Sequence, residues 1–396
     1  MEYRFMRPLD VLYLRGNRLF GEPGEHADAL MPPWPSLFSG ALRSRMLIDR
    51  GVDLHRFARG ERLGDDELDR VLGTPDRPGT FRLASLVVAR ERAEGLETFF
   101  PPPADLFIPA DIQPPAPWLL EPLAVDALSP VAFSRRLDGV PVLRNPLPAK
   151  PSAHYWLSER GFAEYLAGRA PSPDHLIGRR ELWETDPRLG IALRARTRTV
   201  ETGRLYTSDA VALRCGTGFL VGVAGANGML PRAGLVRLGG DGRGAVLEEA
   251  RVGSASSRIP RGDRFRLILA TPGLFPSGWC PLRLDDSDGP RLRFEGLEAR
   301  LVAAAVPRAH VVSGWDLARD RPKPAQRVVP AGAVYWFERL AGDLQVLGVL
   351  LEEGLWPVLE QTGQLALLDD STRIVYEQRR AEGFNNVWLG DWLSRN

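Results

Sequence analysis

Alternating and helically spaced apolar residues divide the start of the chain into a strand and a helix. Residues 2–14 alternate well enough for a strand, and the segment that begins at Pro35 or Ser36 and ends at Gly51 carries an apolar stripe at helical spacing. A loop containing Gly16 and Gly21 joins them. A strand, a glycine-containing loop and a helix in this order are typical of the start of a ferredoxin-like unit.

The rest of the chain is dominated by predicted strands separated by glycine- and serine-rich turns. A hairpin that turns at Thr202-Gly203 precedes one of them. The predicted strands are Thr80–Ala89, Gly218–Ala224, Arg264–Ala270, Leu301–Val306, His310–Gly314, Gln326–Val329, Ala333–Glu338 and Val346–Leu351. Together with the helix near the start, this pattern predicts an α+β fold.

The region from Phe100 to about Pro187 is rich in proline and irregular. Long connections without secondary structure are uncommon in a compact domain, so we predict an insertion packed across a sheet face. A chain of 396 residues is long enough for two domains. We predict an N-terminal domain at 1–215, with this insertion at about 90–187 and a β-hairpin at about 188–214, and a C-terminal domain at 216–396.

Composition narrows the possible functions. A hydrophobic content of 44% supports a core, no apolar run has the length of a membrane span, and residues 1–14 lack a signal-peptide layout. Cys215 and Cys280 make neither a disulfide framework nor a zinc site. We therefore expect a cytoplasmic protein without a metal or a cofactor and without contact to a membrane.

The cations are almost all arginine, because lysine occurs only at Lys150 and Lys323. The bias of a GC-rich genome explains much of this, and the net charge of +1 excludes a general polyanion binder. A guanidinium grips phosphate through two parallel hydrogen bonds and also stacks on bases. Local clusters of arginine can still form a basic groove on a nearly neutral protein.

The segment from Arg308 to Glu338 combines a small backbone, cations and aromatic rings, which an extended nucleic-acid strand requires. Gly314 and Trp315 begin a basic, proline-broken loop that contains Lys323 and Arg327 and ends before a strand-like aromatic run. We expect Lys323 and Arg327 to contact phosphates and Trp315 to stack on a base. A proline-rich hairpin with a solvated basic edge is the alternative.

Arg194, Arg196 and Arg198 alternate along the predicted hairpin. On a strand they would share one face, about 6.6 Å apart, which roughly matches the spacing of phosphates in an extended strand. Such a row favours nucleic-acid binding. An edge strand that carries charge to prevent aggregation is the alternative.

Enzymatic signatures are weak in this sequence. The five histidines are scattered, and neither a nucleophile motif nor a phosphate-binding loop of an NTPase is present. His26 lies beside Glu25 in the loop after the first strand, where a metal-independent ribonuclease could use it as a general acid or base with Tyr13 or an arginine. A hydrogen-bonding surface histidine is the alternative reading.

Near the C-terminus, a glycine and two asparagines precede an apolar strand in GFNNVWLGDW (residues 383–392). A loop of glycine, an aromatic residue and asparagine can bring backbone N–H groups close to a phosphate. A terminal strand that closes the sheet is a compatible interpretation.

Four segments together resemble a RAMP protein of the type III-B CRISPR Cmr module, specifically its third subunit. They are PLDVLYLRGNRLFG with MPPWPSLFSGALRSRM, ELWETDPRLGIALRARTRTVETGRLY, AHVVSGWDLARDRPKPAQRVVPAGAVYWFE and GFNNVWLGDW, which span Pro8 to Trp392. The third is the most specific. In the last, Asn385-Asn386 stands where relatives often have a plainer glycine-rich sequence.

The resemblance implies two tandem ferredoxin-like (RRM-like) RAMP domains with large insertions and a protruding β-hairpin. It also implies a non-catalytic scaffold subunit of an antiviral effector that holds the 5′ tag of the crRNA and contacts the large polymerase-like subunit and the first backbone RAMP subunit. A ribonuclease that matures precursor crRNA and an adaptor that contacts only proteins are the alternatives. The RNA-binding positions carried over are Arg15, Arg18, Arg194, Arg196, Arg198, Gly314, Trp315, Lys323, Arg327, Gly383, Phe384 and Asn385.

Overall fold

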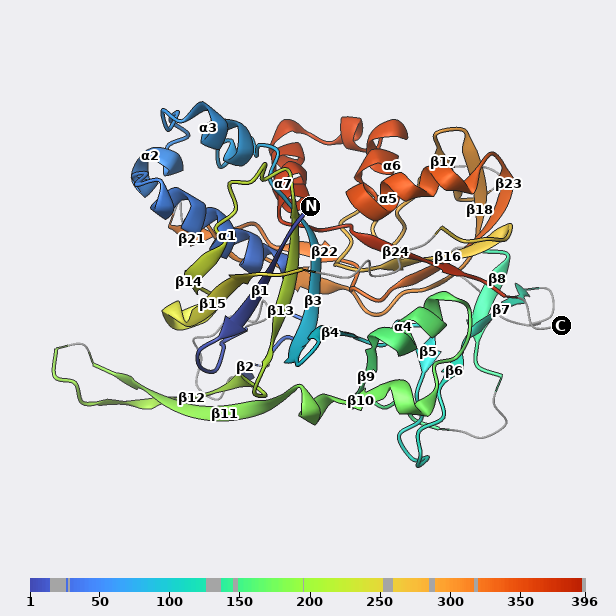
Figure 1. Cartoon of the computed structure of the whole chain (residues 1–396), viewed down its shortest axis with the longest axis horizontal. Helices are drawn as coiled ribbons and strands as arrows, with labels where there is room; N and C mark the ends of the chain where they lie inside the picture. Colours follow the sequence, from blue (N-terminus) through green and yellow to red (C-terminus); the bar gives the residue numbers. More distant parts are fainter. Residues whose placement is uncertain are drawn as a thin grey trace.

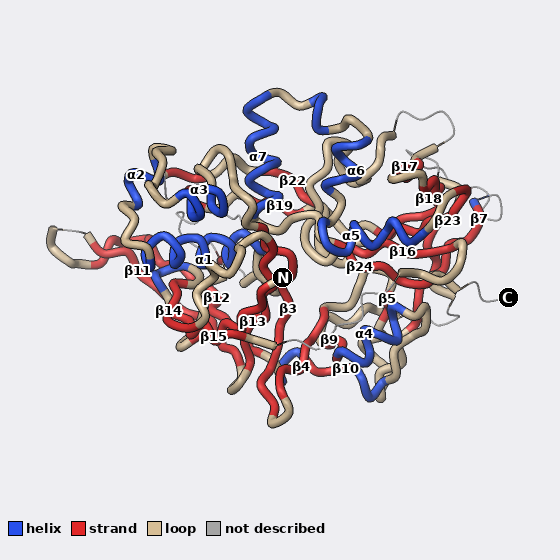
Figure 2. The backbone as a smooth tube through the Cα atoms, turned by 45° about the horizontal axis from the view of Figure 1, so that its top comes forward, coloured by secondary structure: helices blue, strands red, loops and turns tan. Residues whose placement is uncertain are grey.

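The computed structural model shows a chain built mainly of antiparallel strands, with few helices (Figures 1 and 2). The structure describes residues 1–14, 26–27, 29–125, 137–144, 149–194, 196–251, 259–284, 289–316 and 320–393, without the side chains of 26–27, 192 and 201–206. Among these residues, no helix is both long and apolar enough to cross a membrane.

The larger sheet has eight strands in the order β10-β9-β4-β3-β13-β1-β15-β14. Its central strand β13 is buried along almost its whole length, since both neighbours pair with it in antiparallel register. The strands are β1 (Glu2–Pro8), β3 (Arg82–Arg92), β4 (Gly95–Phe100), β9 (Tyr155–Ser158), β10 (Leu176–Gly178), β13 (Thr217–Ala224), β14 (Ala233–Arg237) and β15 (Gly244–Glu249). A single 3₁₀ turn, η4 (Gly240–Gly242), precedes β15.

Helix α1 (Pro35–Asp49) covers one face of this sheet and confirms the helix predicted from the apolar stripe. Phe38, Leu42 and Met46 lie on its buried side, and the Phe38 ring packs 4.9 Å from that of Phe219 on β13. Two short helices follow, α2 (Leu54–Ala58) and α3 (Asp66–Leu72). The carboxylate of Asp65 caps α3 by accepting two backbone N–H groups of its first turn.

The second sheet has five strands in the order β17-β18-β23-β16-β24, and a helical layer covers one of its faces. The strands are β16 (Arg264–Leu269), β17 (Arg291–Phe294), β18 (Leu297–Ala305), β23 (Val334–Ala341) and β24 (Val387–Asp391). The helical elements are η5 (Leu344–Leu347), α5 (Gly348–Glu353), α6 (Trp356–Gln361), η6 (Leu365–Leu367) and α7 (Asp370–Ala381).

Most predicted strands are confirmed, but the one at Val346–Leu351 is wrong. This apolar run forms the end of η5 and the start of α5. The carboxylate of Asp343 accepts the N–H of Gln345 and begins the helical turn. A short apolar run fits a buried helix as well as a strand, so periodicity alone does not separate them.

The central strands of the two sheets follow the same spatial order. In the larger sheet it is β15-β1-β13-β3, and in the second it is β24-β16-β23-β18. Numbered along the chain, each set reads 4-1-3-2, and every pairing within it is antiparallel. The crossover after the first strand carries α1 in the first half, whereas helices α5–α7 follow the third strand in the second half.

The predicted domain boundary at residue 215 is contradicted by the sheets. Strands β13, β14 and β15 follow this position in the chain but pair within the larger sheet, and the second sheet begins with β16 at Arg264. The chain therefore passes from the larger sheet to the second sheet between Glu249 and Arg264. Sequence analysis placed the boundary too early because the chain returns to β1 only after the whole insertion.

The proline-rich insertion packs across the second sheet, as predicted. It contains β5 (Leu106–Phe107), β6 (Trp118–Leu119), β7 (Glu121–Ala124), β8 (Gly139–Val142), α4 (Glu159–Leu166), η2 (Pro173–His175) and η3 (Arg179–Glu181). Phe100 and Phe162, stacked at 4.0 Å, share a core with Ile268 and Trp336 on the face opposite the helical layer. Strands β4, β9 and β10 meanwhile extend the larger sheet. The insertion thus bridges the two halves.

A buried ion pair joins this insertion to the second sheet. Arg266 of β16 donates to Asp105 at 2.7 Å, and both side chains are almost fully buried. The Tyr165 hydroxyl donates to the other oxygen of the Asp105 carboxylate at 2.6 Å, and the Arg266 guanidinium lies over the Tyr165 ring. Burial raises the pKa of Tyr165 well above its ordinary value. Tyr165 is therefore a neutral donor to this carboxylate.

Candidate nucleic-acid interface

The basic loop leaves the second sheet through a narrow two-stranded neck. Strands β19 (His310–Val312) and β22 (Gln326–Val328) pair antiparallel at its base, and β20 (Trp315–Asp316) and β21 (Arg321–Pro322) pair farther out. Gly314 between them has φ of 98°, a conformation that favours glycine. Glycine is therefore required here for the backbone path of the loop, and the predicted contact of Gly314 to RNA stays a prediction.

Trp315 is exposed, with 53% of its surface accessible, so it does not pack under the proline-rich loop as core. Arg321 in β21 and Arg327 in β22 are exposed as well. An accessible indole beside guanidinium groups can stack on a base while the cations contact phosphates. Residues 317–319 of the same loop lie outside the described part of the chain.

Lys323 does not point freely into solvent. Its ammonium lies 2.5 Å from the buried carboxylate of Glu382, beyond the end of α7. That contact satisfies its charge within the protein, so the structure supports a role in holding the loop more than the predicted contact to a phosphate. Sequence analysis missed Glu382 because 59 residues separate the partners.

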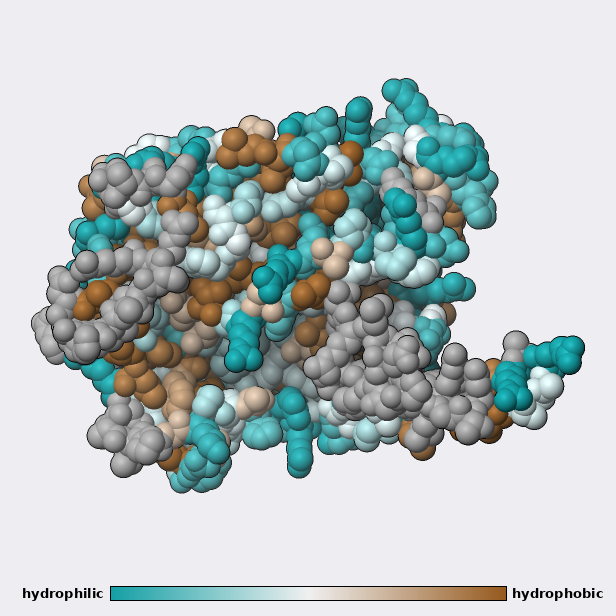
Figure 3. All heavy atoms as spheres, turned by 180° about the vertical axis from the view of Figure 1, so that it is seen from behind, coloured by the Kyte–Doolittle hydropathy of each residue, from teal (hydrophilic) through white to brown (hydrophobic). Residues whose placement is uncertain are grey.

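The hairpin of β11 (Trp183–Leu193) and β12 (Val200–Leu213) stands clear of the body (Figures 1 and 3). Its turn lies at residues 194–199, where Arg198 donates its N–H to the Arg194 carbonyl, and Thr202-Gly203 lies within β12. The predicted turn is therefore wrong. The three arginines are exposed around the tip instead of along one strand face. A non-glycine residue, Arg198, takes the left-handed conformation with φ of 52°.

The apolar face of this hairpin has no cover in the described part of the chain. Leu189, Ile191, Leu193 and Val200 are all exposed near the cationic tip. Behind them, β12 is anchored by an antiparallel bridge from Val211 to Leu12 and by parallel pairing with β2 (His26–Ala27). The arm thus presents exposed apolar and cationic side chains near its tip, and pairing to other segments anchors it at its base.

Two predicted positions and one candidate side chain lie outside the described residues. Arg15 and Arg18 belong to the undescribed segment 15–25. The backbone of His26 is described only as part of β2, which pairs with Thr207 of β12, and nothing is known of its side chain. These predictions stay untested.

The glycine-asparagine turn after α7 is buried inside the molecule. Phe384 and Asn385 each have 0% of their surface accessible. Asn385 accepts the N–H of Leu274 at 2.6 Å, and a Cβ on Gly383 would lie 2.5 Å from the carbonyl of Leu83. Burial contradicts the prediction that Phe384 and Asn385 contact RNA. Their side chains instead fix the connection between α7 and β24, since Asn385 bonds to Leu274 and Phe384 packs in the core of the second sheet.

A pocket missed by sequence analysis opens between the two sheets beside the neck. Its walls are largely aromatic and proline residues, and His310 of β19 meets Trp34 edge to face at 6.0 Å. Burial lowers the pKa of His310, which favours the neutral imidazole. The walls include Trp34, Phe99, Trp156, His310, Pro330 and Trp388. The lining of this pocket is mostly apolar, but its residues are far apart in the sequence and no local motif marks them.

The described part of the chain contains no cluster of three or more histidine, cysteine or acidic side chains that could hold a metal ion. His175 contacts the carboxylate of Glu164 at 3.1 Å within the insertion. His55 and His154 lie at the surface. In the described part of the chain, the candidate contact sites for a ligand are the basic loop, the tip of the hairpin and the pocket between the sheets.

Several solved structures are similar to this chain at low sequence identity. No curated protein matches this chain. Two chains of the type III-B Cmr-beta complex bound to cognate target RNA, one of them also with AMPPnP, have TM-scores of 0.46 and 0.44 at 14% identity, each over 98% of this chain and 96% of the other. A chain of the Csm3-Csm4 subcomplex of the type III-A CRISPR-Cas interference complex has a TM-score of 0.39 at 9% identity, over 87% of this chain and 96% of the other.

The sequence model of one family covers nearly the whole chain. It is that of the CRISPR-associated protein Cas_Cmr3, and it matches residues 4–392. The match includes both sheets, the insertion, the hairpin and the basic loop. This chain therefore belongs to the Cas_Cmr3 family of CRISPR-associated proteins.

Proposed function

We propose that this chain is a non-catalytic RNA-binding scaffold subunit of a type III-B CRISPR effector. It holds the repeat-derived 5′ tag of the crRNA and bridges the large polymerase-like subunit to the first backbone RAMP subunit in antiviral defence. Membership of the Cas_Cmr3 family supports a place in such an effector. The exposed Trp315, on the strand that pairs with the exposed Arg321, is the observation that carries RNA binding.

The fold supports the same proposal. The order 4-1-3-2 in both sheets is what two tandem ferredoxin-like domains would give. Each half lacks one of the two α-helices of that unit: no α-helix follows the third strand of the first half, and none occurs among the described residues between the first two strands of the second half. The pocket between the domains and the loop beside it give an unstacked strand an aromatic path.

The ribonuclease alternative predicts cleavage of repeat RNA without metal. We expect the purified chain to bind repeat RNA in EDTA and to leave it intact, because the histidines are scattered along the sequence and no nucleophile motif is present. Gel analysis of end-labelled RNA is the measurement. Site-specific cleavage that disappears in His26→Ala would replace the scaffold proposal with the nuclease.

The hairpin tip is expected to contribute charge to RNA binding. Replacing Arg194, Arg196 and Arg198 together by alanine should reduce the slope of log affinity against log salt by about 2, since each phosphate contact to a single strand contributes about 0.7. Binding titrations at several salt concentrations measure this. Folding should change little, because all three side chains are exposed.

A matched control for the hairpin variant removes three exposed arginines elsewhere. Arg56, Arg59 and Arg70 lie on or beside α2 and α3, where they pair with Glu61 or Glu67. Their replacement by alanine changes the net charge equally, and it should leave the slope nearly unchanged. If the tip variant binds RNA like the control but fails to join neighbouring subunits, the tip is a protein interface, and the adaptor alternative gains support.

A further inference from the structure

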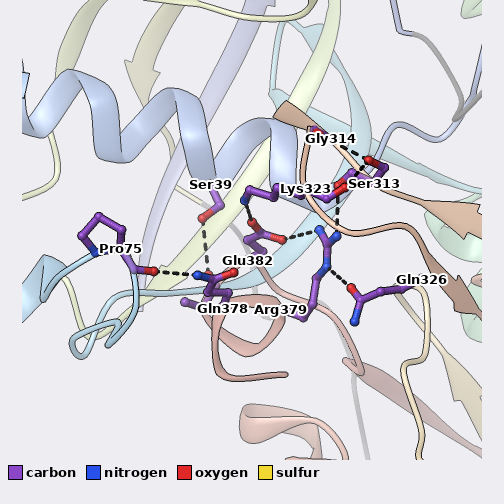
Figure 4. Close-up of polar contacts among 10 residues, drawn as sticks. Ser39, Pro75, Ser313, Gly314, Lys323, Gln326, Gln378, Arg379 and Glu382 are labelled. Atoms are coloured by element: carbon purple, nitrogen blue, oxygen red, sulfur yellow. Dashed lines mark hydrogen bonds and ion pairs between the residues drawn. The ribbon is translucent and has the colours of Figure 1, made fainter. Parts of the chain in front are cut away.

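Two buried charges at the C-terminal end of α7, one in its last turn and one just beyond it, face the base of the basic loop. Arg379 and Glu382 have 1% and 4% of their surface accessible and bond to each other at 2.7 Å. The free oxygen of Glu382 receives the Lys323 ammonium at 2.5 Å. Figure 4 shows Glu382 between these two cations. One carboxylate thus joins the helix to the loop.

Both chain segments that form the neck are tied to this pair. Arg379 donates to the carbonyl of Ser313 at 3.0 Å and to the side-chain oxygen of Gln326 at 2.8 Å (Figure 4). Ser313 and Lys323 also bond to each other across the neck, hydroxyl to carbonyl, at 2.7 Å. The segment that enters the loop and the segment that leaves it are therefore held by one guanidinium.

The same turn is fixed to the first domain. The hydroxyl of Ser39 on α1 donates to the carbonyl of Ala381 at 3.4 Å, and Gln378 donates to the carbonyl of Pro75 at 2.7 Å. Asn386, just beyond, donates to the carbonyl of Leu83 on β3 at 3.2 Å. The orientation of the loop relative to both sheets therefore depends on the end of α7.

Glu382 is the one carboxylate that offsets the positive charges of Arg379 and Lys323 at the end of α7. Burial alone would raise the pKa of Glu382, but the charges of Arg379 and Lys323 outweigh it and hold the pKa below the ordinary value. Glu382 also opposes the lowering of the Arg43 pKa that burial causes on α1. Removing the carboxylate leaves three cations close together, which repel one another and release the neck.

We infer that Glu382 and Arg379 are positioning residues of the RNA-binding loop, which hold the neck so that Trp315 and Arg321 face the crRNA tag. The inference rests on the proposed RNA-binding function of the loop. Neither residue touches RNA, because both are buried. Their contribution is to keep the loop ordered before binding, so that less conformational entropy is lost when RNA binds.

The test compares Glu382→Gln with Glu360→Gln. Glu360 is an exposed carboxylate of the same helical layer that pairs with Arg380, so the control removes the same charge without touching the neck. We expect amide hydrogen exchange in residues 313–326 to rise at least about tenfold in Glu382→Gln only. Affinity for tag RNA should fall about tenfold, and Trp315→Ala should add little to that loss, because a loosened loop no longer presents the ring.

Lys323→Met serves as a second variant in case Glu382→Gln fails to fold. It leaves the Arg379–Glu382 pair buried and should give a smaller change in the same direction. Unchanged amide hydrogen exchange in the neck of the variants would overturn the inference. It would not affect the proposal that the loop binds RNA. A loosened neck with normal RNA affinity, or full additivity with Trp315→Ala, would overturn it too. If the unaltered chain binds no tag RNA, the proposed function itself fails, and the inference fails with it.

Discussion

Replacing Asp105 by alanine is expected to lower the free energy of unfolding by about 3–5 kcal/mol, because it leaves the Arg266 guanidinium buried without its carboxylate. Asp105 has 0% and Arg266 has 2% of its surface accessible, so water cannot replace the lost partner. The Tyr165 hydroxyl loses its acceptor in the same step. Thermal unfolding should show a midpoint lower by about 4–6 °C, given the unfolding entropy of a chain of 396 residues.

Asp263→Ala is the matched control for this prediction. Asp263 also pairs with an arginine, Arg339, but its side chain is 69% exposed. An ion pair in water contributes little, so the melting temperature should barely change. Similar melting temperatures for the two variants would show that the buried pair does not hold the insertion on the second sheet.

Trp315→Ala is expected to weaken binding of tag-bearing RNA by about 1–3 kcal/mol, the usual contribution of one base stacked on an aromatic ring. The exposed indole contributes little to the core, so the melting temperature should stay within about a degree or two of the parent value. Unrelated single strands should lose less affinity, because the tag positions a base at the ring. Fluorescence anisotropy with both RNAs measures the difference.

Trp392→Ala is a useful comparison for that variant. Trp392 also lies at an end of the second sheet, where the Arg264 guanidinium covers its ring at 5.1 Å. Its loss should leave the affinity for tag RNA unchanged. An equal loss of affinity in both variants, or a lower melting temperature of Trp315→Ala with unchanged RNA binding, would remove Trp315 from the interface.

Local patterns in the sequence predicted most of the secondary structure. The stripe of Phe38 and Leu42 indicated α1, and apolar runs indicated β13, β16, β18 and β23. The hairpin turn was misplaced because Thr202-Gly203 is a strong local turn signal, whereas pairing from Trp183 with Leu213 to Leu193 with Val200 sets the register over the whole arm. The pairing of the two strands along their length outweighed the local preference of Thr202-Gly203 for a turn.

The candidate nucleic-acid interface could be predicted from the sequence only where a single segment contains all of its residues. The loop with Gly314 and Trp315 could be found from its residues, and the indole is accessible as stacking requires. The partner of Lys323 lies beyond the end of α7, and the pocket combines Trp34, Trp156 and Trp388 from distant segments. Such contacts are created by the packing of segments that lie far apart in the chain, which local spacing does not encode. The turn at Gly383 was predicted to bind phosphate because its local sequence does not show that the turn is buried.

Ultraviolet crosslinking of a crRNA-loaded effector assembly, with the linked peptides mapped by mass spectrometry, tests the central claim most directly. If this chain holds the 5′ tag, tag nucleotides should crosslink to peptides containing residues 308–327, with Trp315 among the linked positions, and the yield should fall in Trp315→Ala. Tag nucleotides that crosslink only to other subunits, while this chain is present in the assembly, would contradict the account.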